Sequence, residues 1–175
     1  MMKFVAAVAI ACLAFSPVQK GKQFPTLNGE TLEGKSVTLP DAAKGKKTLI
    51  GMAYSQKAEE ALNTWYQPVY DKFIAKRGMF DKDYDVNLYF VPMYIGLKQA
   101  AYEASLKELK KSSRKDLFPY ILFYKGELSP YDKELKMTDK AEAYFFLLDE
   151  KGKVIYSTTG KYSDKKMDEL EELLD

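Results

Sequence analysis

The stretch from Lys47 to Phe73 constrains the fold more than any other part of the chain. It opens with an apolar run from Thr48 to Tyr54, whose length and composition predict a buried strand. At Ser55, a favourable N-cap residue, the period changes. Apolar residues then recur three or four positions apart, which predicts an amphipathic helix: Ala58, Leu62, Trp65, Val69 and Phe73. A core strand is therefore expected to run directly into a long helix, and Pro68 is expected to kink or break that helix.

Two residue types that carry much of enzyme chemistry are scarce. The 175 residues include no histidine, which excludes imidazole acid–base catalysis, Ser-His triads and His-ligated metals. The one cysteine, Cys12, lies in an apolar N-terminal segment, so its removal would leave a domain without a thiol or disulfide. The net charge of +2 predicts neither a nucleic-acid ligand nor an acidic partner. No cofactor or metal is expected from this composition.

The N-terminal residues 1–16 have the pattern of a secretory signal peptide. Lys3 supplies a short positive region, and the apolar run that follows is too short to span a bilayer comfortably. Small residues favour cleavage after Ala14. The main alternative is a lipoprotein signal acylated at Cys12, since Ala9-Ile10-Ala11-Cys12 is a loose lipobox. An internal start codon or a buried N-terminal strand is the third interpretation.

These features predict three segments: a signal peptide at 1–16, a short linker at 17–23 and one domain at 24–175. A mitochondrial presequence is disfavoured because no arginine occurs before Arg77. The expected location is therefore exported, in the periplasm or associated with the cell envelope. A lipid anchor at Cys12 is the only membrane attachment expected.

The later elements alternate strand and helix before a closing hairpin. Lys107–Lys115 is interpreted as the solvated face of a helix, because the overall charge is balanced. A strand is expected at Val86–Ile95, and Pro92 is expected to end it or place it at an edge of the sheet. A helix is expected from Gly96, with Tyr102, Leu106 and Leu109 as its apolar stripe. The remaining expected elements are an insertion at Lys115–Lys140, a hairpin of Ala141–Leu148 and Lys153–Ser157, and a last helix capped by Ser163.

This order predicts an α/β protein, a three-layer α/β/α sandwich with a central mixed sheet, an N-terminal extension and an insertion before the C-terminal hairpin. Three stretches carry a family resemblance: FPTLNGETLEGKSVTLP, KTLIGMAYSQKAEEALNTW and AYFFLLDEKGKVIYSTTGKYS. They resemble the thioredoxin-like fold, and the first and third are similar to peroxiredoxin-like and exported thiol–disulfide reductase domains. The whole set is most similar to the mitochondrial ATP-synthase assembly-factor family, a thioredoxin-like family without general reductase chemistry.

The chain departs from the redox members of that fold in two ways. Their Cys-x-x-Cys motif is replaced by Ser55-Gln56-Lys57-Ala58 or, in the other possible alignment, by Lys57-Ala58-Glu59-Glu60. Their cis-proline before the hairpin strand is also missing, because Asp139–Ala143 contains no proline. Both losses point to a natural non-redox relative, in which thiol–disulfide oxidoreductase or peroxidase activity is not expected.

The loop at this position is the candidate binding site. Its residues are Tyr54, Ser55, Gln56, Lys57, Glu59 and Glu60. Lys57 and the helix N-terminus could contact an anionic group, although ordinary helix-start polarity explains the same residues. Trp65 could anchor a partner, but its place in the apolar stripe favours core packing. Asp81, Asp83 and Asp85 give only a weak cation signal, because the glycine and distal glutamate of an EF-hand loop are absent.

Three functions are compatible with these residues. The first is a non-enzymatic, exported protein-binding or assembly module whose partner is another envelope protein. The second is a small-ligand binding protein or non-thiol enzyme that uses the Ser55–Glu60 loop. The third is a structural component of the envelope. The first is preferred, because a fold usually used on protein substrates is retained here without its thiols.

Overall fold

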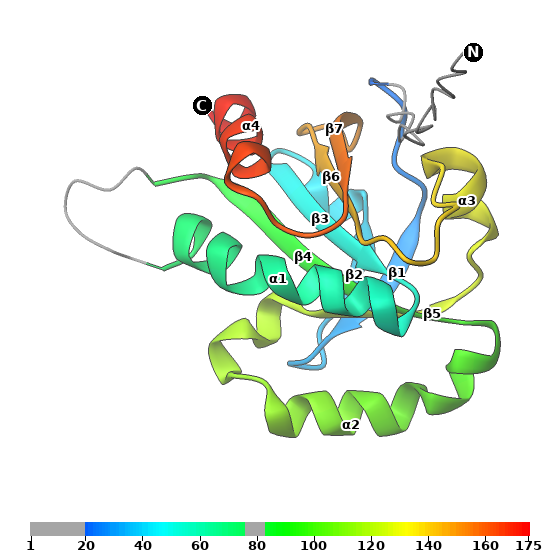
Figure 1. Ribbon diagram of the computed structural model, residues 1–175. Helices are drawn as coiled ribbons and strands as arrows, with labels where there is room; N and C mark the ends of the chain where they lie inside the picture. Colours follow the sequence, from blue (N-terminus) through cyan, green and yellow to red (C-terminus); the bar gives the residue numbers. More distant parts are fainter. Residues whose placement is uncertain (1–19, 76–82) are drawn as a thin grey trace, which may run out of the picture.

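The computed structural model describes residues 20–75 and 83–175 (Figure 1). The expected signal peptide, Cys12 and Asp81 lie outside the described residues. The strands form one seven-stranded sheet in the order β2-β1-β5-β4-β3-β6-β7. Its strands are β1 (Leu27–Thr31), β2 (Ser36–Leu39), β3 (Lys47–Ala53), β4 (Val86–Ile95), β5 (Leu122–Gly126), β6 (Tyr144–Leu148) and β7 (Val154–Thr159).

The sheet is mixed, as the strand–helix order predicted. Strands β3, β4 and β5 run parallel, while β1–β2, β1–β5, β3–β6 and β6–β7 are antiparallel pairs. The final hairpin turns at the expected Asp149–Gly152, where the Asp149 carboxylate accepts hydrogen bonds from the backbone N–H groups of Lys151 and Lys153. Parallel strands in the centre and antiparallel strands at both sides give the mixed sheet of the thioredoxin-like fold.

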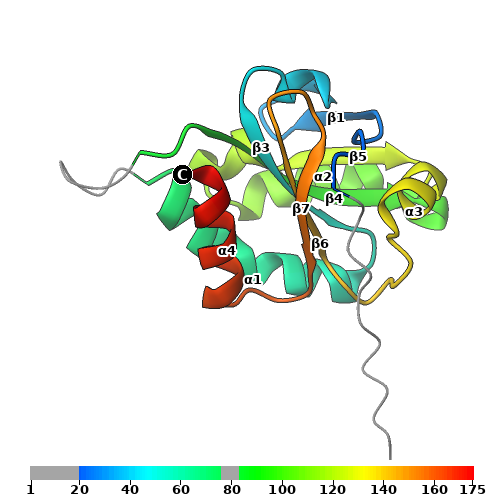
Figure 2. The same cartoon turned by 90° about the horizontal axis from the view of Figure 1, so that it is seen from above.

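Helices cover the two faces of the sheet unequally (Figures 1 and 2). The helices are α1 (Gln56–Phe73), α2 (Tyr102–Ser112), α3 (Ser129–Leu135) and α4 (Asp164–Leu174), with short 3-10 helices η1 (Asp41–Ala43), η2 (Gly96–Ala101) and η3 (Lys115–Tyr120). Side chains of a strand alternate between faces, so β4 shows which helix covers which face. Leu88 and Phe90 pack with α1 and α4, and Tyr94 packs with α2. Val91 and Met93 point to the other face, where the seven-residue α3 packs.

Strand β3 is a fully buried inner strand of the sheet. Every residue from Thr48 to Ala53 is buried, because β3 pairs on both edges and has a packed layer on both faces. The apolar run seen in the sequence is therefore a two-sided core strand. Its Gly51 leaves space for Leu62 of α1 and Phe145 of β6, which lie where a Cβ atom would stand.

Two expectations about proline need correction: α1 does not break at Pro68, and Pro92 neither ends β4 nor places it at an edge of the sheet. Helix α1 continues through Pro68, because the stripe of Trp65, Val69 and Phe73 is buried on both sides of the proline and packing outweighs the lost hydrogen bond. Strand β4 continues through Pro92 and lies at the centre of the sheet, not at an edge. Pairing with β3 ends at Pro92, and the regular pairing with β5 begins at Met93. The N–H group that Pro92 lacks is therefore missing at the point where β4 changes from one partner strand to the other.

The expected insertion at Lys115–Lys140 also needs correction. It contains β5, which joins the N-terminal hairpin to β4 and is therefore part of the sheet. The pairing of β5 with β1 joins residues far apart in the sequence, so no local pattern predicts it. Only residues 127–143, which include α3, form an insertion between β5 and the C-terminal hairpin.

Candidate functional site at the carboxyl end of β3

Ser55 forms the junction between the core strand and α1. It is the N-cap of α1, and its Oγ accepts a hydrogen bond from the backbone N–H of Ala58 at 3.1 Å. The same hydroxyl donates a short hydrogen bond to the carbonyl oxygen of Lys140. The hydroxyl is thus engaged both as acceptor and as donor. It also ties the start of α1 to the segment that precedes β6.

That segment, residues 136–143, is called the closing loop below. Tyr54, at the end of the core strand, is buried, and its hydroxyl donates to the carbonyl of Met137 at 3.0 Å. Burial raises the pKa of the Tyr54 hydroxyl well above its usual range. Tyr54 also stacks on Tyr144, whose hydroxyl accepts from the backbone N–H of Asp139 at 2.7 Å. Three side-chain hydroxyl groups therefore hold the closing loop against the junction.

The remaining predicted site residues lie on the first turn and a half of α1. Gln56, Lys57 and Glu60 are exposed to solvent. Glu59 forms an ion pair of 2.6 Å with Lys98, which belongs to η2 at the end of β4. The Lys98 ammonium also lies 5.3 Å from the centre of the Tyr94 ring. The structure thus brings the predicted residues to one end of the sheet, where Tyr54 is buried and its hydroxyl contacts the closing loop.

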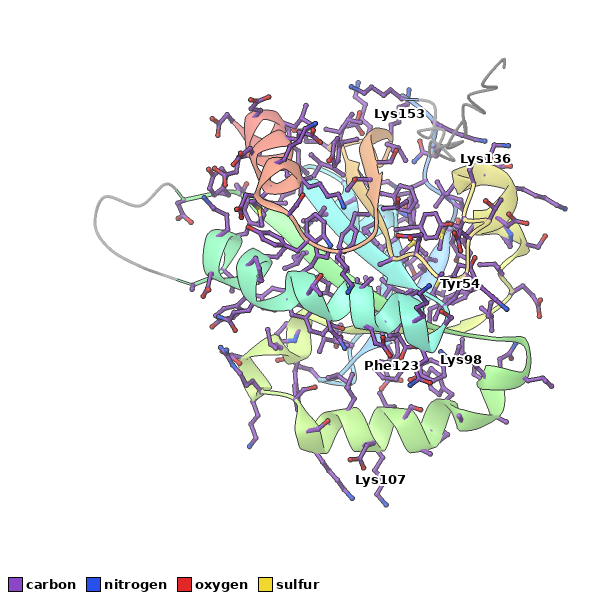
Figure 3. All side chains as sticks on the ribbon, viewed as in Figure 1. Tyr54, Lys98, Lys107, Phe123, Lys136 and Lys153 are labelled. Carbon is purple, nitrogen blue, oxygen red and sulfur yellow. The ribbon has the colours of Figure 1, made fainter. Side chains whose placement is uncertain are left out.

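Sequence reasoning missed two participants, Lys98 and the closing-loop carbonyls. Figure 3 shows Lys98 and Tyr54 at the same end of the sheet. The parallel pairing of β3 and β4 could have indicated Lys98, because the carboxyl ends of neighbouring parallel strands share one edge. No sequence signal indicates the carbonyls of Met137 and Lys140, since every residue carries one.

Two shallow depressions lie elsewhere on the molecule. One, of about 260 Å³, is lined by the β1–β2 hairpin, the start of β4 and η3. The other, of about 320 Å³, lies between that hairpin and the side chains of Tyr102, Phe123 and Lys125. Neither is lined by a residue of the Ser55–Glu60 loop, so neither supports a small-ligand site there.

Burial and ion pairing show the structural roles of two further candidate residues, Trp65 and Asp85. Trp65 is a core residue, as the stripe predicted: it is fully buried, stacks on Phe145 and donates to the carbonyl of Gly160. Asp85 pairs with Lys46 at 2.6 Å. Within residues 20–75 and 83–175, no group of three acidic or thiol side chains is arranged to hold a metal ion. In the same described part, no helix has the length and apolar character needed to cross a bilayer.

Comparison with known proteins gives a family and a fold. A family model described as ATP10 protein matches residues 8–174. No curated protein sequence matches the chain.

Solved structures match over most of the chain at low sequence identity. A putative thiol:disulfide interchange protein DsbE from Chlorobium tepidum has 15% identity and a TM-score of 0.54, covering 90% of this chain and 96% of the other. A peroxiredoxin-like protein from Aquifex aeolicus has 13% identity and a TM-score of 0.52, covering 91% and 90%. BsSco, a member of the Sco family of cytochrome c oxidase assembly proteins, has 12% identity and a TM-score of 0.56, covering 90% and 94%. At these identities the matches show a common thioredoxin-like fold.

Proposed function

Because this chain belongs to the ATP10 protein family of assembly factors, we propose that it assists assembly by binding another protein of the cell envelope, without thiol chemistry. The main support for this proposal is that the Ser55 hydroxyl is already used both as a hydrogen-bond donor and as an acceptor within the fold. Redox relatives need a free thiolate at the start of this helix. In this chain the N-cap of the helix is Ser55, whose hydroxyl caps the helix and holds the closing loop, and neither possible alignment of the motif places a cysteine at the helix start. Residues 20–175 contain no cysteine that could replace it.

The proposed contact surface is the exposed start of α1. Gln56, Lys57 and Glu60 project from a helix turn whose base is fixed by the Ser55 cap and by the ion pair of Glu59 with Lys98. A base fixed by these contacts and carrying exposed polar side chains suits recognition of a protein surface, because little order is lost in the base on binding. The N-terminal signal pattern supports export, so the partner is sought in the envelope. Given the family, a subunit of the ATP synthase is the first partner to test.

Site-specific photocrosslinking in cells tests this proposal. A photoreactive amino acid at Lys57 is expected to give one dominant crosslinked protein, and the same amino acid at the remote Lys153 is not. The surface variant Gln56→Ala/Lys57→Ala/Glu60→Ala, with the probe moved to Lys140, is expected to lose that product. Ser55 stays intact in this variant because its hydroxyl caps the helix.

Two results would overturn the proposal. One is equal crosslinking from Lys57 and Lys153. The other is reduction of a disulfide substrate by the purified protein, which would contradict the non-redox role.

A further inference from the structure

The charge of the helical layer changes sign from one end to the other. Residues 96–120, which contain α2, carry six lysines and arginines against three acidic residues, a net charge of +3. Helix α4 carries two lysines against five acidic residues, a net charge of −3. The two helices lie at opposite ends of the layer, with α1 between them (Figure 1). The chain is therefore nearly neutral as a whole, but positive charge is concentrated at one end of the helical layer and negative charge at the other.

The positive end has cations that nothing in the described chain neutralises. Lys110 and Lys111 follow Lys107 by three and four positions and so lie on the same side of α2 as Lys107, and Lys115 follows at the start of η3. All four are exposed, and none forms an ion pair within residues 20–75 and 83–175. Figure 3 shows Lys107 projecting away from the molecule. We call these four lysines the α2 face.

The α2 face is a cluster of exposed cations, which matches an extended anionic surface in charge. None of its four lysines lines either of the two depressions described above. Leu97 in η2, which leads directly into α2, is 98% exposed and is the only large apolar side chain that is exposed in the described part of the chain. Exposed cations and an exposed apolar side chain in one helical segment are typical of peripheral contacts with anionic membranes.

We propose that the α2 face docks onto the anionic phospholipid headgroups of a bilayer, with Leu97 entering the interface and α4 turned away. This contact is separate from protein binding at the start of α1 and from any acyl chain at Cys12. It would hold the molecule on the membrane in one orientation.

Vesicle cosedimentation tests the contact with purified full-length protein that carries Cys12→Ser, so that no acyl chain contributes. Vesicles of phosphatidylcholine with one third phosphatidylglycerol are expected to bind the protein at low salt and release it at high salt. Pure phosphatidylcholine vesicles are expected not to bind it. Lys107→Gln/Lys110→Gln/Lys111→Gln is expected to bind about a hundred-fold more weakly, roughly fivefold for each charge removed. Leu97→Ser is expected to weaken binding severalfold.

A matched control removes three exposed lysines from the hairpin turn and the loop before α4: Lys151→Gln/Lys153→Gln/Lys161→Gln. It has the same net charge as the α2 variant and is expected to bind within about twofold of the wild type, since charges far from the contact act weakly. Equal losses in both triple variants, binding to neutral vesicles, or no binding at low salt would overturn the proposal. So would pelleting without vesicles, which would indicate that the acidic and basic ends bind each other. Crosslinking from Lys57 is scored separately, so failure of one proposal leaves the other intact.

Discussion

Ser55 holds two segments of the fold together through one hydroxyl. As N-cap it accepts from Ala58, and as donor it holds Lys140 of the closing loop. Ser163 offers a natural comparison, because it occupies the N-cap of α4 without a side-chain cap hydrogen bond. The same residue type at two helix starts therefore differs in how much it stabilises the fold.

We expect Ser55→Ala to lower the free energy of unfolding by about 1 to 2 kcal/mol, since an N-cap bond is lost. Ser163→Ala is expected to change it by less than about 0.5 kcal/mol, as for a surface position without such a bond. Chemical denaturation followed by Trp65 fluorescence measures both. Ser55→Asp separates the two bonds, because a carboxylate can accept from Ala58 but cannot donate to Lys140. Equal losses in the two alanine variants would show that the cap of α1 is not special.

At the scale of elements, the fit of α1 onto the sheet depends on Gly51. A Cβ atom there would lie 2.6 Å from Phe145 and 2.8 Å from Leu62. Phe145 cannot move aside easily, because it is fully buried and stacks on Trp65 with ring centres 4.1 Å apart. The absent side chain thus sets the spacing of β3, α1 and β6.

Gly51→Ala is therefore expected to destabilise the protein by about 1 to 3 kcal/mol through overpacking. In Gly51→Ala/Phe145→Leu the smaller side chain makes room, so the double variant is expected to lose at least about 0.5 kcal/mol less than the sum of the single losses. Denaturant titration of all four proteins measures this coupling. Strict additivity would mean that the new methyl group is accommodated without contacting Phe145.

The elements differ in how far the sequence alone could predict them. The strand-to-helix junction at Ser55 and the hairpin turn at Gly152 follow from local patterns, and the structure confirms both. The role of β5 could not be predicted locally, because Gly29 pairs with Tyr124 across most of the chain. The effects of Pro68 and Pro92 could not be predicted locally for a related reason. Burial of the helix and the change of partner strand decide whether each proline is tolerated, and both are properties of the assembled sheet.

The candidate site was predictable in place but not in detail. The position of the loop at the end of the core strand follows from the fold. Its chemistry depends on contacts from other elements, namely Lys98 of η2 and the carbonyl groups of the closing loop. In these contacts the hydroxyl groups of Tyr54 and Ser55 bind the closing loop, whereas Gln56, Lys57 and Glu60 are exposed to solvent.

The opposite net charges of residues 96–120 and of α4 make the charge distribution of the protein asymmetric. Helix α1 packs between them, so α4 lies two helix spacings from α2, roughly 16 to 20 Å. That is about two Debye lengths at 0.1 M salt, at which charges on exposed surfaces are largely screened. Charges on α4 should therefore have little effect on a surface that α2 touches.

Asp168→Asn/Glu172→Gln tests this directly, because both side chains are exposed on α4. The variant raises the net charge by two, yet we expect its affinity for anionic vesicles to stay within about twofold of the wild type, given the screening. Cosedimentation at 0.1 M salt is the measurement. A clear gain in affinity would mean that total charge, and not the orientation of α2, governs binding.

The pairing of β1 with β5 also has a consequence for the newly made chain. The hairpin of β1 and β2 is among the first structured parts to be synthesised, but its inner edge has no partner until Leu122–Gly126 has followed. Strand β3 likewise waits for β6 on one side. A chain leaving the ribosome therefore cannot complete its sheet until β5, β6 and β7 have been made. This delay favours passage through a secretion channel, which accepts only unfolded polypeptide, so the topology itself is compatible with the export proposed above.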